Sequence, residues 1–126
     1  MAKLQIDPTG PIPTIRVHVG RAQLGNYTFG LWDAQGRNPR VSGQGVNTDD
    51  IEDVFRIVAS RKELLGLNRH TLDGVIWVKA LKKGKKRYAI EVEIKQGELQ
   101  LASWKDSGEM TTSMKNLKNS WTIELS

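Results

Sequence analysis

Two histidines and no cysteine define the metal and nucleophilic chemistry that this sequence can support. The missing thiol excludes disulfides, thiolate zinc sites and cysteine nucleophiles. His18 is expected on the outward side of a strand, and His70 just before another strand, far along the chain. Neither position brings a second ligand with it, so the sequence predicts no metal site and no cofactor.

Two carboxylates and a lysine form a second candidate, because Asp73, Glu93 and Lys95 follow the pattern Asp-x19-Glu-x-Lys. This pattern resembles the catalytic signature of the PD-(D/E)xK nucleases. The resemblance implies that the carboxylates hold a divalent metal and that the lysine orients the attacking water. However, Leu72 stands where the family has proline, and Gln96-Gly97 predicts a turn where the family continues into a helix. The expected register also places Asp73 on the opposite face from the other two, so a metal-dependent nuclease is only a remote alternative and no catalytic residue is assigned.

Basic side chains are concentrated at one place, with six of them within residues 79–87. A protruding basic β-ribbon can follow a phosphate backbone, so nucleic-acid or polyanion binding is the main alternative function. The structural explanation is a solvated turn whose lysines prevent sheets from pairing edge to edge. The polyanion-binding residues of this alternative are Lys79, Lys82, Lys83, Lys85, Lys86 and Arg87.

Tryptophan is abundant, with four in 126 residues. Trp77 is predicted to lie in the core. Trp32 and Trp104 fall on the faces opposite the main apolar residues of their strands, and exposed aromatic side chains concentrate binding energy at interfaces. We therefore predict Trp32 and Trp104 as interaction residues. The alternative is a second small core beneath a covering helix.

The elements that would position these residues are mainly strands. Residues 14–19 alternate, with Ile15, Val17 and Val19 on one face, and Tyr27, Phe29 and Leu31 share one face of a second strand after a turn at Gly25-Asn26. Residues 33–36 predict a type I turn, and residues 37–47 are rich in glycine and polar residues and predict a loop. The final strand is expected at 121–125, after an edge strand or long loop at 105–119.

An amphipathic helix is predicted over about residues 49–65. Ile51, Val54, Phe55 and Val58 recur at helical spacing, acidic residues gather at the expected start, and Gly66 is expected to end the helix.

A three-strand antiparallel meander is predicted over about residues 74–104. A turn at 83–86 pairs Trp77 with Val92, and a second turn at Gln96-Gly97 pairs Ile94 with Leu99. This register brings Tyr88 and the other apolar side chains together on one face.

The fold expected from these elements is α+β and mainly antiparallel β, a small β-sandwich or partly open barrel with the helix packed on it. The chain is long enough for one domain, so we expect an extended leader over residues 1–13 and a single globular domain over 14–126.

The expected function is a non-enzymatic protein-interaction or accessory module that binds a protein partner or its own copies through a sheet face or edge. The polar residues singled out above have structural explanations, and the expected strand register separates Asp73 from Glu93 and Lys95, so no catalytic group is assigned. Nucleic acid is a possible partner because of the basic hairpin at residues 79–87, whereas a membrane is not expected. No signal peptide or membrane-spanning segment is visible, so the compartment is unknown and cytoplasmic by default.

Overall fold

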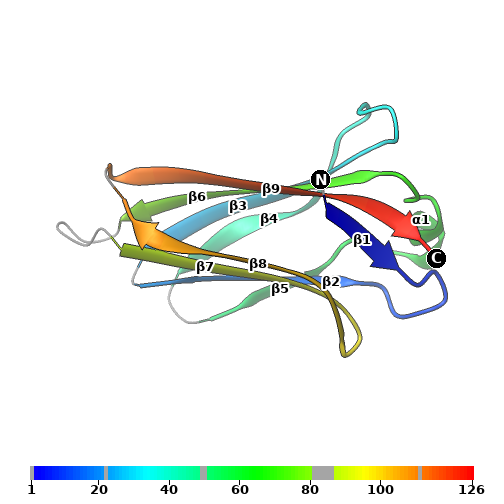
Figure 1. The fold of residues 1–126 in the computed structure, drawn as a ribbon, viewed down its shortest axis with the longest axis horizontal. Coiled ribbons are helices and arrows are strands. Elements are labelled where there is room, and N and C mark those ends of the chain that lie inside the picture. The colour runs from blue at the N-terminus through cyan, green and yellow to red at the C-terminus, as the bar shows by residue number, and fades with distance from the viewer. Residues whose placement is uncertain (1, 22, 49–50, 81–86, 111) are drawn as a thin grey trace.

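The computed structural model is a sandwich of two β-sheets (Figure 1). It describes residues 2–21, 23–48, 51–80, 87–110 and 112–126. The larger sheet has the strand order β1-β9-β6-β3-β4, and the smaller sheet has the order β5-β2-β7-β8. The elements are β1 (Ala2–Ile6), β2 (Thr14–Gly20), β3 (Gln23–Trp32), β4 (Arg40–Thr48), β5 (Asp53–Arg56), α1 (Arg61–Leu65), β6 (Thr71–Ala80), β7 (Arg87–Gln96), β8 (Leu99–Glu109) and β9 (Met114–Leu125). The predicted small β-sandwich is confirmed, and its sheets do not close into a barrel.

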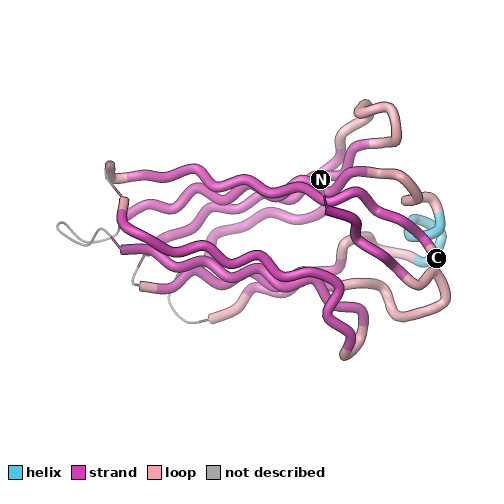
Figure 2. The backbone as a smooth tube through the Cα atoms, viewed as in Figure 1, coloured by secondary structure: helices cyan, strands magenta, loops and turns pink. Residues whose placement is uncertain are grey.

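The strands run along the long axis of the molecule, and the helix lies at one end of the sandwich (Figure 2). The alternation at the start of the chain forms β2 as predicted, with Ile15, Val17 and Val19 fully buried. They lie opposite apolar residues of β7, so one face of the smaller sheet supplies half of the core. The other half comes from the inward side chains of the larger sheet.

The second predicted strand is present but longer, because Gly25-Asn26 lies inside β3 and not in a turn. A Cβ at residue 25 would lie 2.4 Å from Cγ2 of Val19. The glycine therefore permits close packing between the sheets. The predicted loop at 37–47 is wrong from Arg40 onward, where the chain forms β4. Gly43 and Gly45 of this strand lie against aromatic rings, so they too permit close packing and do not mark a loop. The turn at 33–36 is confirmed by a hydrogen bond from Gly36 N to the carbonyl oxygen of Asp33.

The predicted helix over 49–65 is wrong for most of its length. Asp53–Arg56 is strand β5, which pairs with β2, and Phe55 stacks on Tyr27 with 5.9 Å between ring centroids. The helical stripe does not exist, because Ile51 and Val54 are exposed. Valine and phenylalanine favour strands, and pairing with β2 outweighs a spacing that also suits a helix. The helix begins at Arg61, after Ser60, whose Oγ accepts a hydrogen bond from Glu63 N, and ends before Gly66 as predicted.

The predicted pairing of β6 with β7 is also wrong, because the two strands belong to different sheets. β6 pairs with β3 and β9, and β7 pairs with β2 and β8. Both faces of β6 are apolar, and the face that enters the core carries Ile76 and Val78, not Val75 and Trp77. The turn predicted at 83–86 lies outside the described residues.

The hairpin between β7 and β8 is confirmed with a shifted register. Gln96 pairs with Leu99 and Ile94 with Ala102, so the turn is formed by Gly97 and Glu98. Gly97 adopts a positive φ of 62°, which favours glycine. Tyr88 is buried as predicted, and the last strand begins at Met114, well before the expected residue 121.

Part of the expected leader forms β1, which pairs in parallel with β9. Leu4 and Ile6 are fully buried in the core. The connection to β2 is held by the buried side chain of Gln96, whose Nε2 donates hydrogen bonds to the carbonyl oxygens of Asp7 and Pro11 at 2.6 and 2.9 Å.

Candidate functional site

The two outward faces of the sandwich differ in charge. The outward face of the smaller sheet carries acidic and basic side chains that lie close to one another and neutralise one another's charge. Its ion pairs are Arg16–Glu52 at 3.3 Å, Lys95–Glu93 at 3.5 Å and Lys105–Glu91 at 3.8 Å. Burying a face of paired charges against a partner would gain little free energy.

The outward face of the larger sheet is mostly uncharged. Three neighbouring rows across β9, β6, β3 and β4 contain two lysines, Lys79 and Lys118, and no carboxylate. We name the uncharged outward side chains of this surface the Trp77 face: Leu24, Asn26, Thr28, Gln44, Val46, Val75, Trp77, Met114 and Asn116. No described element covers this face of the sheet, which lies on the outside of the sandwich (Figure 1).

Trp77 occupies the middle of this surface, with Asn116 on one side and Asn26 on the other. Its side chain is 37% exposed, and Val46 and Met114 are each 54% exposed. A flat surface with a large exposed aromatic ring at its centre, flanked by amide side chains, resembles the centre of protein interfaces. Trp77 is therefore not a core residue, which corrects the prediction from the sequence.

The two tryptophans predicted as interaction residues lie on different surfaces. Trp32 is half-buried on the outward side of β3, about 20 Å along the strand from the Trp77 row. Trp104 lies on β8 with its side chain against the core, and its ring centroid is 6.2 Å from that of Trp121 in an edge-to-face contact. Trp32 and Trp77 therefore share the outward face of the larger sheet, whereas Trp104, on the smaller sheet, lies between the two sheets.

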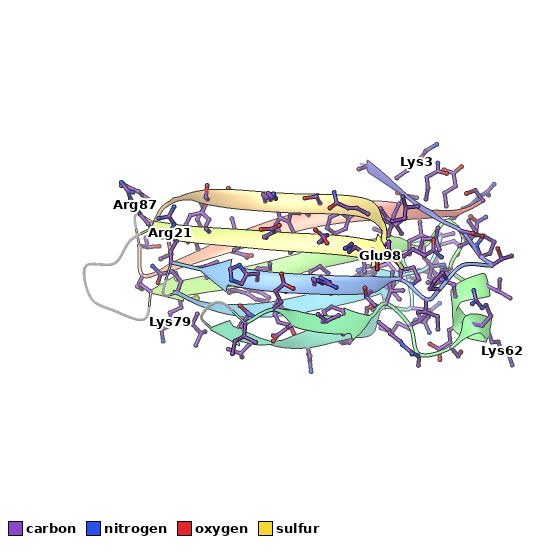
Figure 3. All side chains as sticks on the ribbon, turned by 90° about the horizontal axis from the view of Figure 1, so that it is seen from below. Lys3, Arg21, Lys62, Lys79, Arg87 and Glu98 are labelled. Atoms are coloured by element: carbon purple, nitrogen blue, oxygen red, sulfur yellow. The ribbon has the colours of Figure 1, made fainter. Side chains whose placement is uncertain are left out.

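Basic residues from β6, β7 and the connection between β2 and β3 lie at the end of the sandwich away from α1. Figure 3 shows Arg21, Lys79 and Arg87 together there. Arg87 is paired with Glu109 at 3.7 Å, and Lys115 donates a hydrogen bond to the hydroxyl oxygen of Tyr88 at 2.9 Å. Lys82, Lys83, Lys85 and Lys86 lie outside the described residues, so Lys79 and Arg87 are the two predicted polyanion-binding residues that the structure places.

The residues that resemble a nuclease signature are not brought together. Asp73 lies on the outward side of the larger sheet, where it accepts a hydrogen bond from the Ser120 hydroxyl. Glu93 and Lys95 form an ion pair on the outward side of the smaller sheet. The core separates the two sites, so these residues cannot share a metal ion. Among the described residues, no group of three or more histidine, aspartate or glutamate side chains could hold a metal ion.

A polar contact joins the two sheets inside the core. The hydroxyl of Tyr27 donates a hydrogen bond to Oδ2 of Asp53 at 3.0 Å. Burial raises the pKa of Tyr27 to about 12, and the hydrogen bond and negative charge of Asp53 act in the same direction. The neutral phenol is therefore the form that the folded protein favours.

Ionisation of Tyr27 gives a prediction for alkaline pH. An unfolded tyrosine titrates near pH 10, so between about pH 10 and 12 the unfolded state binds fewer protons than the folded state. We expect the free energy of unfolding to fall as pH rises through this window, and Tyr27→Phe to remove that part of the loss. Denaturation at a series of pH values for both proteins measures it. Equal pH dependence in the two would contradict the prediction.

Comparisons with known proteins give no relative from which a function could be transferred: no family model, curated protein or solved structure matches the chain. In the part of the chain that the structure describes, no helix has the length and apolar character needed to cross a membrane. The geometry of the two outward faces is therefore the basis for inferring function.

Proposed function

We propose that this protein is a non-enzymatic interaction module that binds a protein partner through the Trp77 face. The observation that supports the proposal is the contrast between the two outward faces of one sandwich. One face is covered by paired charges, whereas the other presents Trp77, Val46 and Met114 to solvent with no carboxylate in the surrounding rows. Exposed apolar surface of this kind marks interaction sites in soluble proteins.

The partner surface that suits this face is flat, apolar and able to hydrogen-bond. Asn26 and Asn116 flank Trp77, so their amide groups can donate to and accept from a partner around a central aromatic contact. Lys79 and Lys118 lie in the two rows that flank the Trp77 row, and they favour a partner with acidic residues around its apolar centre.

Site-specific photocrosslinking tests this proposal. A benzophenone amino acid at Val46 lies on the Trp77 face, and the same amino acid at Lys105 lies on the outward face of the smaller sheet. In cells that produce the protein, we expect a discrete crosslinked product from position 46 and none from position 105. The additional change Trp77→Thr should abolish the product, because loss of a central aromatic contact costs about 2 kcal/mol or more of binding free energy.

Loss of the crosslinked product reports on binding only if the Trp77→Thr variant keeps its stability. Trp77 is exposed and threonine suits a strand, so its free energy of unfolding should change by less than about 1 kcal/mol. Equal crosslinking from positions 46 and 105, or a product that persists in a folded Trp77→Thr variant, would contradict the proposal.

Polyanion binding is a second candidate, supported by the position of Arg21, Lys79 and Arg87 at one end of the molecule (Figure 3). A partner bound there would be held by its phosphates, so its affinity would fall steeply with salt. Anisotropy of a labelled oligonucleotide over a salt series, with wild-type protein and Arg87→Glu, distinguishes this candidate from binding at the Trp77 face, because Arg87 lies on the smaller sheet.

A further inference from the structure

The edge strand β4 lacks the usual features that prevent strand pairing. It pairs with β3 on one side, and no strand of the described part pairs with its other edge. Its nine residues include a single charged side chain, Arg40, and no proline. The long edge strand of the smaller sheet, β8, instead carries Lys105, Asp106 and Glu109. Because unpaired backbone groups on an uncharged edge can accept another strand, β4 is the edge most open to addition.

A groove of about 510 Å³ lies beside the first residues of β4. Its base is apolar and buried, formed by Leu31, Ile57 and Val58. Ser42 is the extra residue of a β-bulge opposite Phe29 and Gly30, and its hydroxyl donates a hydrogen bond to the carbonyl oxygen of Ile57 at 2.6 Å. The bulge therefore fixes β4 to the segment after β5 and leaves the groove between them.

The groove is basic at its rim. Arg40 and Arg56 both line it, and Glu63 is the only acidic residue among the described residues of the lining. Glu63 lies 3.9 Å from Arg40. Arg56 is exposed, and no ion pair joins it to another described residue. A guanidinium group above an apolar base fits a ligand that combines a hydrocarbon side chain with a carboxylate.

We propose that the edge of β4 and this groove, together the β4 edge site, bind an extended acidic peptide segment of a partner protein. The peptide adds to the larger sheet as a further strand, places an apolar side chain in the groove and directs a carboxylate to Arg56. Main-chain hydrogen bonds to β4 provide affinity, and the groove and the arginine provide sequence preference. The site shares strand β4, with Gln44 and Val46, with the Trp77 face, but its groove and Arg56 lie outside that face and do not depend on it.

Selection from a phage-displayed library of random short peptides tests the proposal. We expect enriched peptides with an acidic residue at a fixed distance from an apolar residue. Amide signals of Arg40–Thr48 should shift in NMR spectra when such a synthetic peptide is added. Arg56→Glu should weaken its affinity about tenfold, since a charge-assisted hydrogen bond is worth about 1.5 kcal/mol or more.

Two controls make the result specific. Arg87→Glu makes the same charge change at the opposite end of the sandwich and should leave the affinity unchanged (Figure 3). Replacing the acidic residue of the peptide by lysine should abolish binding to wild-type protein and restore part of it to Arg56→Glu.

Three outcomes would overturn the proposal. The first is a library that yields no enriched peptide. The second is a peptide whose affinity is the same for Arg56→Glu and wild type, or whose shifted signals lie on β8, or on Trp77 and Asn116 while those of β4 do not change. The third is a dimer of the protein alone that buries β4, because the occupant would then be a second copy and not an acidic peptide.

Discussion

Gly74→Ala is expected to lower the free energy of unfolding by about 2 kcal/mol, the usual cost of overpacking a filled core. Gly74 lies on the inward side of β6, directly opposite Phe29 of β3. A Cβ at residue 74 would lie 2.5 Å from Cε2 and 3.0 Å from Cδ2 of Phe29. Phe29 is fully buried between Tyr27 and Phe55, so its ring has no free space into which to move. Chemical denaturation monitored by tryptophan fluorescence measures the loss.

Gly30→Ala is the matched control for this prediction. Gly30 lies in β3 on the outward side, where the nearest atoms to an added Cβ are the carbonyl oxygen of Arg40 at 3.6 Å and Nε1 of Trp32 at 4.0 Å. Its cost should stay within about 0.5 kcal/mol. Combining Gly74→Ala with Phe29→Leu should cost less than the sum of the separate changes, because the smaller side chain removes the clash. Equal costs for Gly74→Ala and Gly30→Ala would show that the core has room at residue 74.

Asn47→Leu is expected to destabilise the fold by about 3 kcal/mol. The Asn47 side chain is buried, with Oδ1 accepting a hydrogen bond from Val19 N at 2.8 Å and Nδ2 donating to the carbonyl oxygen of Ile51 at 2.5 Å. These bonds join β4 to β2 and to the chain just before β5. Leucine leaves both backbone groups without their partners, and each such loss costs about 1–3 kcal/mol.

Two further variants separate the hydrogen bonds from the packing at residue 47. Asn47→Asp keeps an acceptor for Val19 N but cannot donate to Ile51, so it should be less stable than wild type at neutral pH. Asn26→Leu changes an exposed asparagine on the Trp77 face and should alter the free energy of unfolding by less than about 0.5 kcal/mol. If Asn47→Leu were as stable as Asn26→Leu, the buried amide would have no structural role.

The strands with one apolar face were predictable from the sequence. In β2, and in β3 from Tyr27 onward, the inward positions are isoleucine, valine, tyrosine, phenylalanine and leucine, while the outward positions other than Trp32 are polar or glycine. Such alternation specifies which face is buried without knowledge of the partner strand. β6 has apolar residues on both sides, so alternation could not decide between Ile76 and Trp77 for the core.

The helix prediction failed because an apolar spacing of three and four residues does not exclude a strand. Phe55 and Ile57 enter the core from β5 and the segment after it, while Val54 and Arg56, which alternate with them, are exposed. The short helix has a clear local signal, Ser60 followed three residues later by Glu63. Glu63 N donates to the Ser60 hydroxyl oxygen at 3.2 Å, as the capping pattern predicts.

The candidate sites depend on pairing across the whole chain, which short-range patterns cannot specify. The assumption that β6 and β7 form a hairpin placed Trp77 in the core, so the Trp77 face was missed. The groove beside β4 was missed because its glycine-rich strand resembles a loop. The contact of Gly43 with Phe55 shows that these glycines make room for rings, a role that no local pattern reveals.

The arrangement of β1 has a consequence for the order in which the protein can fold. Ala2 pairs with Trp121 and Ile6 with Leu125, so β1 finds its partner only after residues 121–125 have been synthesised. β6 lies between β3 and β9, and within the described residues only two strand pairs, β3–β4 and β7–β8, join neighbours in sequence. Closing such long loops is slow, so we expect folding on the scale of milliseconds to seconds. Until β9 is available, Leu4, Ile6 and the adjacent edge of β6 remain uncovered, and a nascent chain is open to chaperones and to misassociation during that interval.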